Sequence, residues 1–160
     1  MLASYLVVII AQTKGVILLK KLIAISAITT ALLAGDANRV VFDCSSGDMR
    51  FVSSRLMLID SVANELKTSG ESYDMVLTIH SGCTPISTSE IDDDPIKMKI
   101  TDQLKALATN HGVKIEACEI ALDRFGIELS DLPSHIGSVK NSITRVIKLQ
   151  NSGYALIPFN

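Results

Sequence analysis

Clusters of positive charge are nearly missing from this sequence, and that shortage excludes one large class of function. The 160 residues carry a formal net charge of −2, and no run of basic residues extends beyond the pair Lys20 and Lys21. A nucleic-acid-binding surface needs several Lys or Arg side chains on one face to neutralise phosphates. We therefore expect no nucleic-acid partner.

The glycine motifs that bind phosphates are also missing. The turn-rich segment CSSGD, residues 44–48, follows an apolar run and could offer backbone N–H groups to an anion. It has neither the G-x-G-x-x-G spacing of dinucleotide sites nor the spacing of a P-loop. Nucleotide binding is therefore unsupported, and we expect no cofactor.

Charged residues are rare at the beginning of the chain, where residues 1–37 differ from the rest. Lys20 and Lys21 precede an apolar stretch, residues 22–34, and small residues follow it. This order is typical of a secretory signal, so we expect an exported, periplasmic protein. Two other interpretations remain: a membrane anchor formed by residues 16–34, whose length approaches that of a membrane span, or a first core element.

The remainder, residues 38–160, is long enough for one domain with its own core. It contains no internal repeats and no low-complexity segments. Apolar runs predict strands at residues 38–43, 73–80, 112–118 and 154–159, and spacings of three or four predict helices at residues 50–69, 97–110, 119–125 and 139–150. Polar segments at residues 81–95 and 127–137 are expected to be connections.

Strands that alternate with helices predict the fold class. We expect an α/β domain with a single doubly wound, mostly parallel sheet flanked by helices, similar to flavodoxin or Rossmann folds. In the flavodoxin-like strand order 2-1-3, the first strand is central. Ligands of such sheets bind at the carboxyl ends of the strands.

All three cysteines follow or end predicted strands, so we expect their sulfurs at the same edge of the sheet. Cys118 also begins a predicted helix, and the positive end of a helix dipole favours the nucleophilic thiolate. The carboxylate of Glu119 opposes this effect, and the sequence leaves open whether Arg124 lies near enough to offset it. The alternative is that Cys118 is a small buried hydrophobic residue that closes a core strand.

Cys44 and Cys83 allow several arrangements. Three cysteines in an exported chain cannot all pair internally, so a disulfide between Cys44 and Cys83 would leave Cys118 free. One of them could instead act as a resolving thiol for Cys118, or both could be buried thiols. A zinc or copper site with His80 is a further alternative, although the spacing matches no compact ligand motif.

Three segments of the sequence resemble the DsrE/DsrF-like family. They are HGVKIEACEIALDRFGI (residues 111–127), the predicted strand at residues 38–43, and the closing LQNSGYALIPF. This family includes YchN-like proteins and TusD-type sulfur-relay subunits. The resemblance implies that Cys118 is the sulfur-accepting thiol. It also implies a homo-oligomer, a trimer or a hexamer, that exchanges sulfane sulfur with donor and acceptor proteins or small sulfur species.

Two function classes follow from these observations. In the first, the protein is a sulfur carrier that holds a persulfide on Cys118, with chemistry closer to a sulfurtransferase than to a hydrolase or an oxidoreductase. In the second, it is a non-catalytic oligomeric binding module that uses the strand-end crevice for a small ligand or a protein partner. Only the first requires an accessible, nucleophilic thiol at Cys118.

Overall fold

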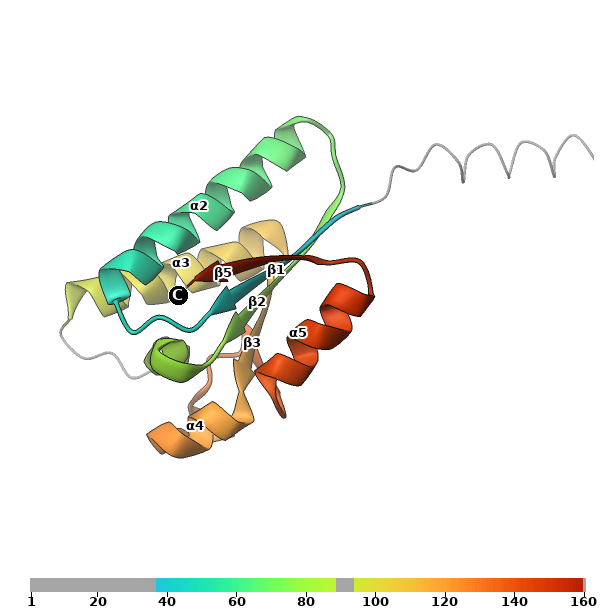
Figure 1. Ribbon diagram of the computed structural model, residues 1–160. Helices are drawn as coiled ribbons and strands as arrows, with labels where there is room; N and C mark the ends of the chain where they lie inside the picture. The colour runs from blue at the N-terminus through green and yellow to red at the C-terminus, as the bar shows by residue number, and fades with distance from the viewer. Residues whose placement is uncertain (1–36, 89–93, 160) are drawn as a thin grey trace, which may run out of the picture. The chain divides into compact units, whose positions relative to one another are not determined.

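The structure is a computed structural model, and it describes residues 37–88 and 94–159 (Figure 1). The predicted leader, residues 1–37, lies outside the described residues except for Ala37, and the signal-peptide interpretation stays a prediction. Within the described part of the chain, no helix is long and apolar enough to cross a membrane.

Five parallel strands form one sheet in the order β4-β3-β2-β1-β5, which confirms the predicted fold class. The strands are β1 (Asn38–Cys44), β2 (Tyr73–Ile79), β3 (Lys114–Cys118), β4 (Ile136–Val139) and β5 (Ala155–Phe159). The predicted order 2-1-3 is wrong. β3 pairs with β2, and the second edge of β1 is taken by β5, with Cys44 opposite Phe159.

Two long helices cover one face of the sheet, as Figure 1 shows. They are α2 (Met49–Thr68) and α3 (Pro95–His111). Both begin at an aspartate: the Asp48 carboxylate accepts hydrogen bonds from the N–H groups of Arg50 and Phe51, and the Asp94 carboxylate accepts one from Ile96 N–H. Such caps satisfy backbone donors that the first turn leaves unpaired.

The core between these helices and the sheet consists of buried aliphatic side chains. Alternate residues of β1 and β2, such as Phe42 and Leu77, point toward α2 and α3, because successive strand side chains face opposite sides. Leu56 and Leu104 from the two helices meet them. The fold therefore holds the carboxyl ends of β1 and β2 in fixed register.

On the opposite face, α5 (Ser142–Asn151) packs Val146 and Leu149 against Val41 and Val76. We predicted that this helix begins at Val139, but it begins at Ser142. Asn141 is its N-cap, and the Asn141 side-chain oxygen accepts from the N–H groups of Ile143 and Thr144. Two of the apolar residues whose spacing predicts this helix, Ile143 and Ile147, are exposed.

The segment predicted as a connection, residues 127–137, contains two regular elements. A short 3-10 helix, η2 (Leu129–Asp131), precedes β4 (Ile136–Val139), which pairs with β3. β4 is an edge strand of four residues in which only Ile136 is buried, so its sequence lacks the alternation that predicts a strand. Val139, which we assigned to the last helix, ends β4.

The polar segment after β2 is also more regular than predicted. It forms a 3-10 helix, η1 (Ser81–Ser87), in which Cys83, Thr84 and Ile86 are buried. Residues 89–93 of the predicted loop lie outside the described residues. α4 (Glu119–Phe125) begins directly after β3 and ends at Gly126, as predicted, and it lies beside η1 at the carboxyl edge of the sheet (Figure 1).

We expect Gly82→Ala to destabilise the fold, because η1 touches the turn after β1 at this glycine. A Cβ atom on Gly82 would lie 2.8 Å from Gly47 N and 3.1 Å from the Ser45 carbonyl oxygen, and neither backbone atom can rotate away. The free energy of unfolding should fall by about 2 kcal/mol in urea denaturation.

Gly47→Ala is the matched control for this substitution. Its Cβ would meet no heavy atom nearer than 3.7 Å, which is ordinary van der Waals contact. Equal denaturation midpoints for the two variants would show that η1 and the turn after β1 are not in the close contact that the structure shows at Gly82.

Candidate functional site

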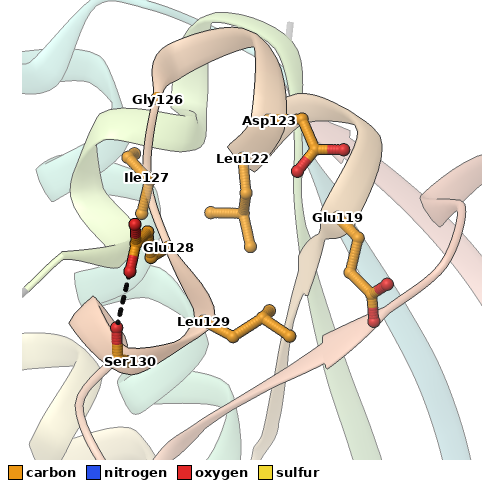
Figure 2. Close-up of a pocket in the computed structure, with 8 residues that line it drawn as sticks. All are labelled: Glu119, Leu122, Asp123, Gly126, Ile127, Glu128, Leu129 and Ser130. Carbon is orange, nitrogen blue, oxygen red and sulfur yellow. Dashed lines mark hydrogen bonds between the residues drawn. The ribbon is translucent and has the colours of Figure 1, made fainter.

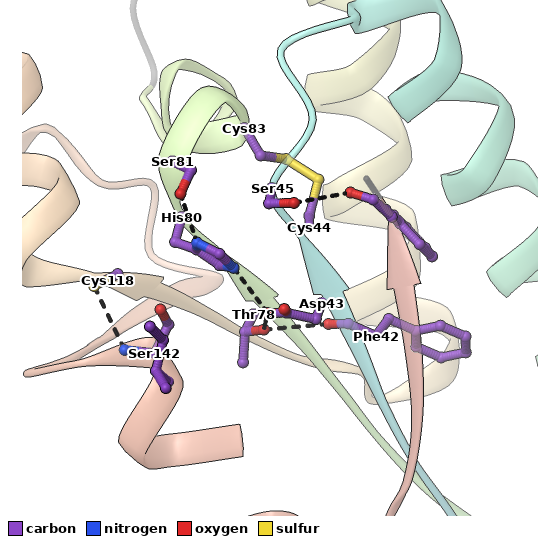
Figure 3. A network of polar contacts seen from close by, with 12 residues as sticks. Phe42, Asp43, Cys44, Ser45, Thr78, His80, Ser81, Cys83, Cys118 and Ser142 are labelled. Carbon is purple, nitrogen blue, oxygen red and sulfur yellow. Dashed lines mark hydrogen bonds and ion pairs between the residues drawn. A yellow bond between two sulfur atoms is a disulfide. The ribbon is translucent and has the colours of Figure 1, made fainter. Parts of the chain in front are cut away.

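The three cysteines lie at the carboxyl edge of the sheet. Cys44 ends β1, Cys83 lies in η1 just after β2, and Cys118 ends β3. Cys44 and Cys83 are joined by a disulfide with an S–S distance of 1.97 Å, and both are fully buried. Cys118 is therefore the free thiol of the chain, and the disulfide connects the turn after β1 to η1 (Figure 3).

Cys118 is held where three elements meet. It pairs with Val139 of β4, it is the N-cap of α4, and its side chain reaches the beginning of α5. The Ser142 backbone N–H donates a hydrogen bond to Cys118 Sγ over 3.4 Å (Figure 3). Cys118 is 5% exposed, so the thiol is nearly covered but lies at the wall of a pocket.

The pKa of the Cys118 thiol lies below its ordinary value. Burial alone would raise the pKa, because a charged sulfur is poorly solvated there. Hydrogen bonds from the Ser142 N–H and hydroxyl, together with the N–H groups of Ala121 and Ile120, outweigh burial and lower the pKa. These donors stabilise the thiolate, which is the nucleophilic form.

Glu119, the carboxylate expected to oppose the thiolate, is occupied elsewhere. Its two oxygens bind Lys140 Nζ at 3.0 Å and the Ser138 hydroxyl at 2.9 Å. The hydrogen bond from Lys140 is the main cause of a lowered pKa for Glu119. Because Lys140 balances its charge, Glu119 adds less negative potential at Cys118 than its place in the sequence suggested.

We expect Ser142→Ala to make the thiol less reactive near neutral pH. The substitution removes the hydroxyl that lowers the pKa of Cys118, so the pKa rises and the thiolate fraction falls. Alkylation of Cys118 by iodoacetamide, followed against pH, should be several-fold slower at pH 7 and should approach the wild-type rate at high pH.

Ser138→Ala is the control for this experiment, because the Ser138 hydroxyl contacts Glu119 and not the thiol. Its alkylation profile should match that of the wild type. Identical profiles for Ser142→Ala and the wild type would mean that the hydroxyl has no effect on the thiolate.

A pocket of about 440 Å³ opens beside Cys118. Its wall combines three apolar side chains, Ile120, Phe125 and Ile143, which are all exposed. Arg124 also lines the pocket and makes no hydrogen bond or ion pair with another described residue. A free guanidinium beside a thiol favours anionic reactants.

Four polar side chains form a network at the same edge (Figure 3). His80 Nε2 lies 3.1 Å from Asp43 Oδ1, and His80 Nδ1 lies 2.8 Å from Ser81 Oγ. The Thr78 hydroxyl donates to the same Asp43 oxygen. Burial raises the pKa of Asp43, but the hydrogen bonds from His80 and Thr78 outweigh it and lower the pKa, so Asp43 is ionised.

A second pocket, of about 610 Å³, lies on the other side of α4 (Figure 2). It carries the carboxylates of Glu119, Asp123 and Glu128, and Cys118 is not part of its wall. Asp123 and Glu128 repel anions, so an anionic ligand is expected on the side of Arg124 and not here.

The alternative metal site does not have the ligands it needs. The sulfurs of Cys44 and Cys83 are bonded to each other and so offer no thiolate. Within residues 37–88 and 94–159, no group of three or more His, Cys, Asp or Glu side chains is arranged to hold a metal ion.

Sequence reasoning placed Cys118 and the other two cysteines at one edge, but it missed the groups around the thiol. The predicted last helix begins three residues too early, so Asn141 and Ser142 fell inside it and were not recognised as the residues at its start. Ser81 and Asp43 carry no recognisable motif. A signal for the helix start did exist, since Asn is a preferred N-cap residue.

The fold and the site define a small α/β protein with a parallel sheet and one free thiol at the strand ends. The model of the DsrE/DsrF-like family matches residues 39–159, and the chain belongs to this family. A protein of Aquifex aeolicus (strain VF5) is 35% identical over 153 residues, covering 92% of this chain and 67% of that protein.

Two solved structures share the fold. The protein of unknown function MTH1491 from Methanobacterium thermoautotrophicum has a TM-score of 0.57 and 24% identity, covering 75% of this chain and 97% of that one. The ychN protein from E. coli has a TM-score of 0.55 and 13% identity, covering 76% and 99%.

Proposed function

We propose that this protein handles sulfur by accepting sulfane sulfur on Cys118 as a persulfide and passing it to another thiol. The observation that carries the proposal is a free thiol whose pKa is lowered by the Ser142 and α4 donors at the wall of an open pocket. Membership of the DsrE/DsrF-like family, which is related to sulfur-relay proteins, supports the same chemistry.

The transfer consists of two thiol-exchange steps. In loading, the Cys118 thiolate attacks the outer sulfur of a donor persulfide, a new S–S bond forms, and the donor sulfur leaves as a thiolate. In unloading, an acceptor thiolate attacks the outer sulfur on Cys118, and Cys118 leaves as a thiolate. A leaving group of low pKa departs faster, so the same donors assist both steps.

Treatment of the purified protein with polysulfide tests this function. We expect the Cys118 peptide to gain the mass of one sulfur atom, and a reductant to remove it. A folded protein whose Cys118 stays unmodified would favour the other class, a non-catalytic module that binds a small ligand or a protein partner in the same pocket.

We further propose that the protein works outside the cytoplasm as a homo-oligomer. The Cys44–Cys83 disulfide supports an oxidising compartment, and the apolar stretch at residues 22–34 supports export. Exposed apolar side chains on the edge strand β5, Leu156 and Ile157, support contact with another copy. N-terminal sequencing of the exported protein distinguishes a cleaved signal from a retained anchor.

A further inference from the structure

Ser81, His80 and Asp43 are connected in the order that activates a serine. Ser81 Oγ lies 2.8 Å from His80 Nδ1, and His80 Nε2 lies 3.1 Å from Asp43 Oδ1. A nucleophile within hydrogen-bond distance of a base, with the base oriented by a third group, is the general arrangement for covalent catalysis.

The charge on Asp43 determines where the imidazole proton lies. An ionised carboxylate only accepts hydrogen bonds, so His80 Nε2 must carry the proton that it shares with Asp43. In the neutral ring, Nδ1 then has a lone pair and accepts from the Ser81 hydroxyl. The Ser81 proton is therefore directed at a base that can remove it.

The backbone also distinguishes Ser81. Its φ of 52° is the only positive φ of a non-glycine residue in the described part of the chain. A non-glycine residue in this region is strained, and such strain is often found at functional sites. The turn from β2 into η1 leaves Ser81 exposed, and its side chain lines the same pocket as Cys118.

The pocket beside Ser81 also suits an apolar acyl group. The exposed side chains of Ile120, Phe125 and Ile143 offer an apolar surface to an acyl chain.

We propose that Ser81 is the nucleophile of a second reactive centre, which hydrolyses esters or thioesters of apolar acyl groups. This activity goes beyond sulfur transfer and does not depend on it. Here Ser81 is the catalytic residue, His80 is its base, and Asp43 is a positioning residue that holds the imidazole.

The reaction takes place in two balanced steps. Ser81 Oγ bonds to the acyl carbon while its proton passes to His80 Nδ1, and the leaving oxygen or sulfur departs with that proton as its bond to the acyl carbon breaks. Water then bonds to the acyl carbon and gives a proton to His80. The ester bond to Ser81 breaks, Oγ takes the proton back, and a carboxylic acid is released.

The test uses the full chain carrying Cys118→Ser, so that the thiol cannot react with acyl groups. We expect a fluorophosphonate to label the Ser81 peptide and p-nitrophenyl esters to be hydrolysed with turnover. In the same chain, Ser81→Gly should lower kcat/KM by at least about 100-fold. Glycine accepts a positive φ without strain, so this variant should remain as stable as its parent.

Two further variants separate catalysis from structure. Asp43→Asn should lower kcat at least about tenfold and leave KM unchanged, because it disturbs the imidazole and not the pocket wall. Ser45→Ala removes a hydroxyl at the same edge that donates to the Phe159 carbonyl and not to His80, so its rate should not change.

Absence of label from Ser81 in the folded protein would overturn the proposal. An equal kcat/KM for Ser81→Gly and its parent would overturn it as well. Neither result bears on persulfide formation at Cys118, which is measured separately in the chain that retains the thiol.

Discussion

Replacing Cys118 with serine is expected to abolish the uptake of sulfane sulfur. The proposed carrier chemistry needs a thiolate, and Cys118 is the one cysteine that is not in the disulfide. A serine hydroxyl is not deprotonated near neutral pH and forms no persulfide. We therefore expect complete loss of the reducible sulfur adduct, and not a slower reaction.

Stability should change little in Cys118→Ser, so the loss can be attributed to chemistry. Serine is close to cysteine in size, and its oxygen can accept the hydrogen bond from Ser142 N–H that the sulfur accepts now. Intact and peptide masses after polysulfide treatment check the loss of uptake, and thermal unfolding checks the fold.

Peptide mapping is necessary because polysulfide can also attack a disulfide. A sulfur adduct on the Cys44 or Cys83 peptide in Cys118→Ser, at the wild-type level of uptake, would contradict the assignment of Cys118 as the carrier. The burial of both half-cystines argues against such attack in the folded protein, since neither sulfur is exposed.

The second large effect is expected on loss of the Cys44–Cys83 disulfide. The bond joins residues 39 positions apart, and the chain-entropy model gives about 4 kcal/mol of stabilisation for a loop of that size. The double variant Cys44→Ala/Cys83→Ala should lose roughly this much free energy of unfolding. Urea denaturation of the oxidised wild type and of the variant measures the difference.

The double variant also provides the control for chemical reduction. A reductant should lower the denaturation midpoint of the wild type and leave that of the variant unchanged, because the variant has no bond to reduce. If the wild type keeps its midpoint after mass spectrometry shows full reduction, the disulfide is not a significant source of stability.

The disulfide also affects the site, because it holds η1 against the end of β1. Asp43 lies next to Cys44, and His80 lies three residues before Cys83. The disulfide therefore holds together the two segments that form the His80–Asp43 contact. The His80 backbone N–H reinforces the connection by donating to the Cys44 carbonyl.

Hydrophobic pattern alone determined the fold class and the place of the cysteines. β-branched runs such as residues 38–43 indicate strands buried on both faces, and their alternation with amphipathic helices leads to a parallel sheet. In a parallel sheet all strands end at the same edge, so cysteines at strand ends must gather there. This conclusion needs no knowledge of strand order.

Strand order and the surroundings of the thiol were decided only by the tertiary structure. The backbone hydrogen bonds between parallel strands are the same whatever the sequence. The sequence therefore does not determine whether the second neighbour of β1 is β3 or β5. The strand β4 has one buried residue, and its pattern is too short to recognise. Ser142 reaches Cys118, and Ser81 and Asp43 reach His80, only because β1, β2, β3 and β4 end at the same edge of the sheet. The pairing of distant segments is not encoded in local periodicity.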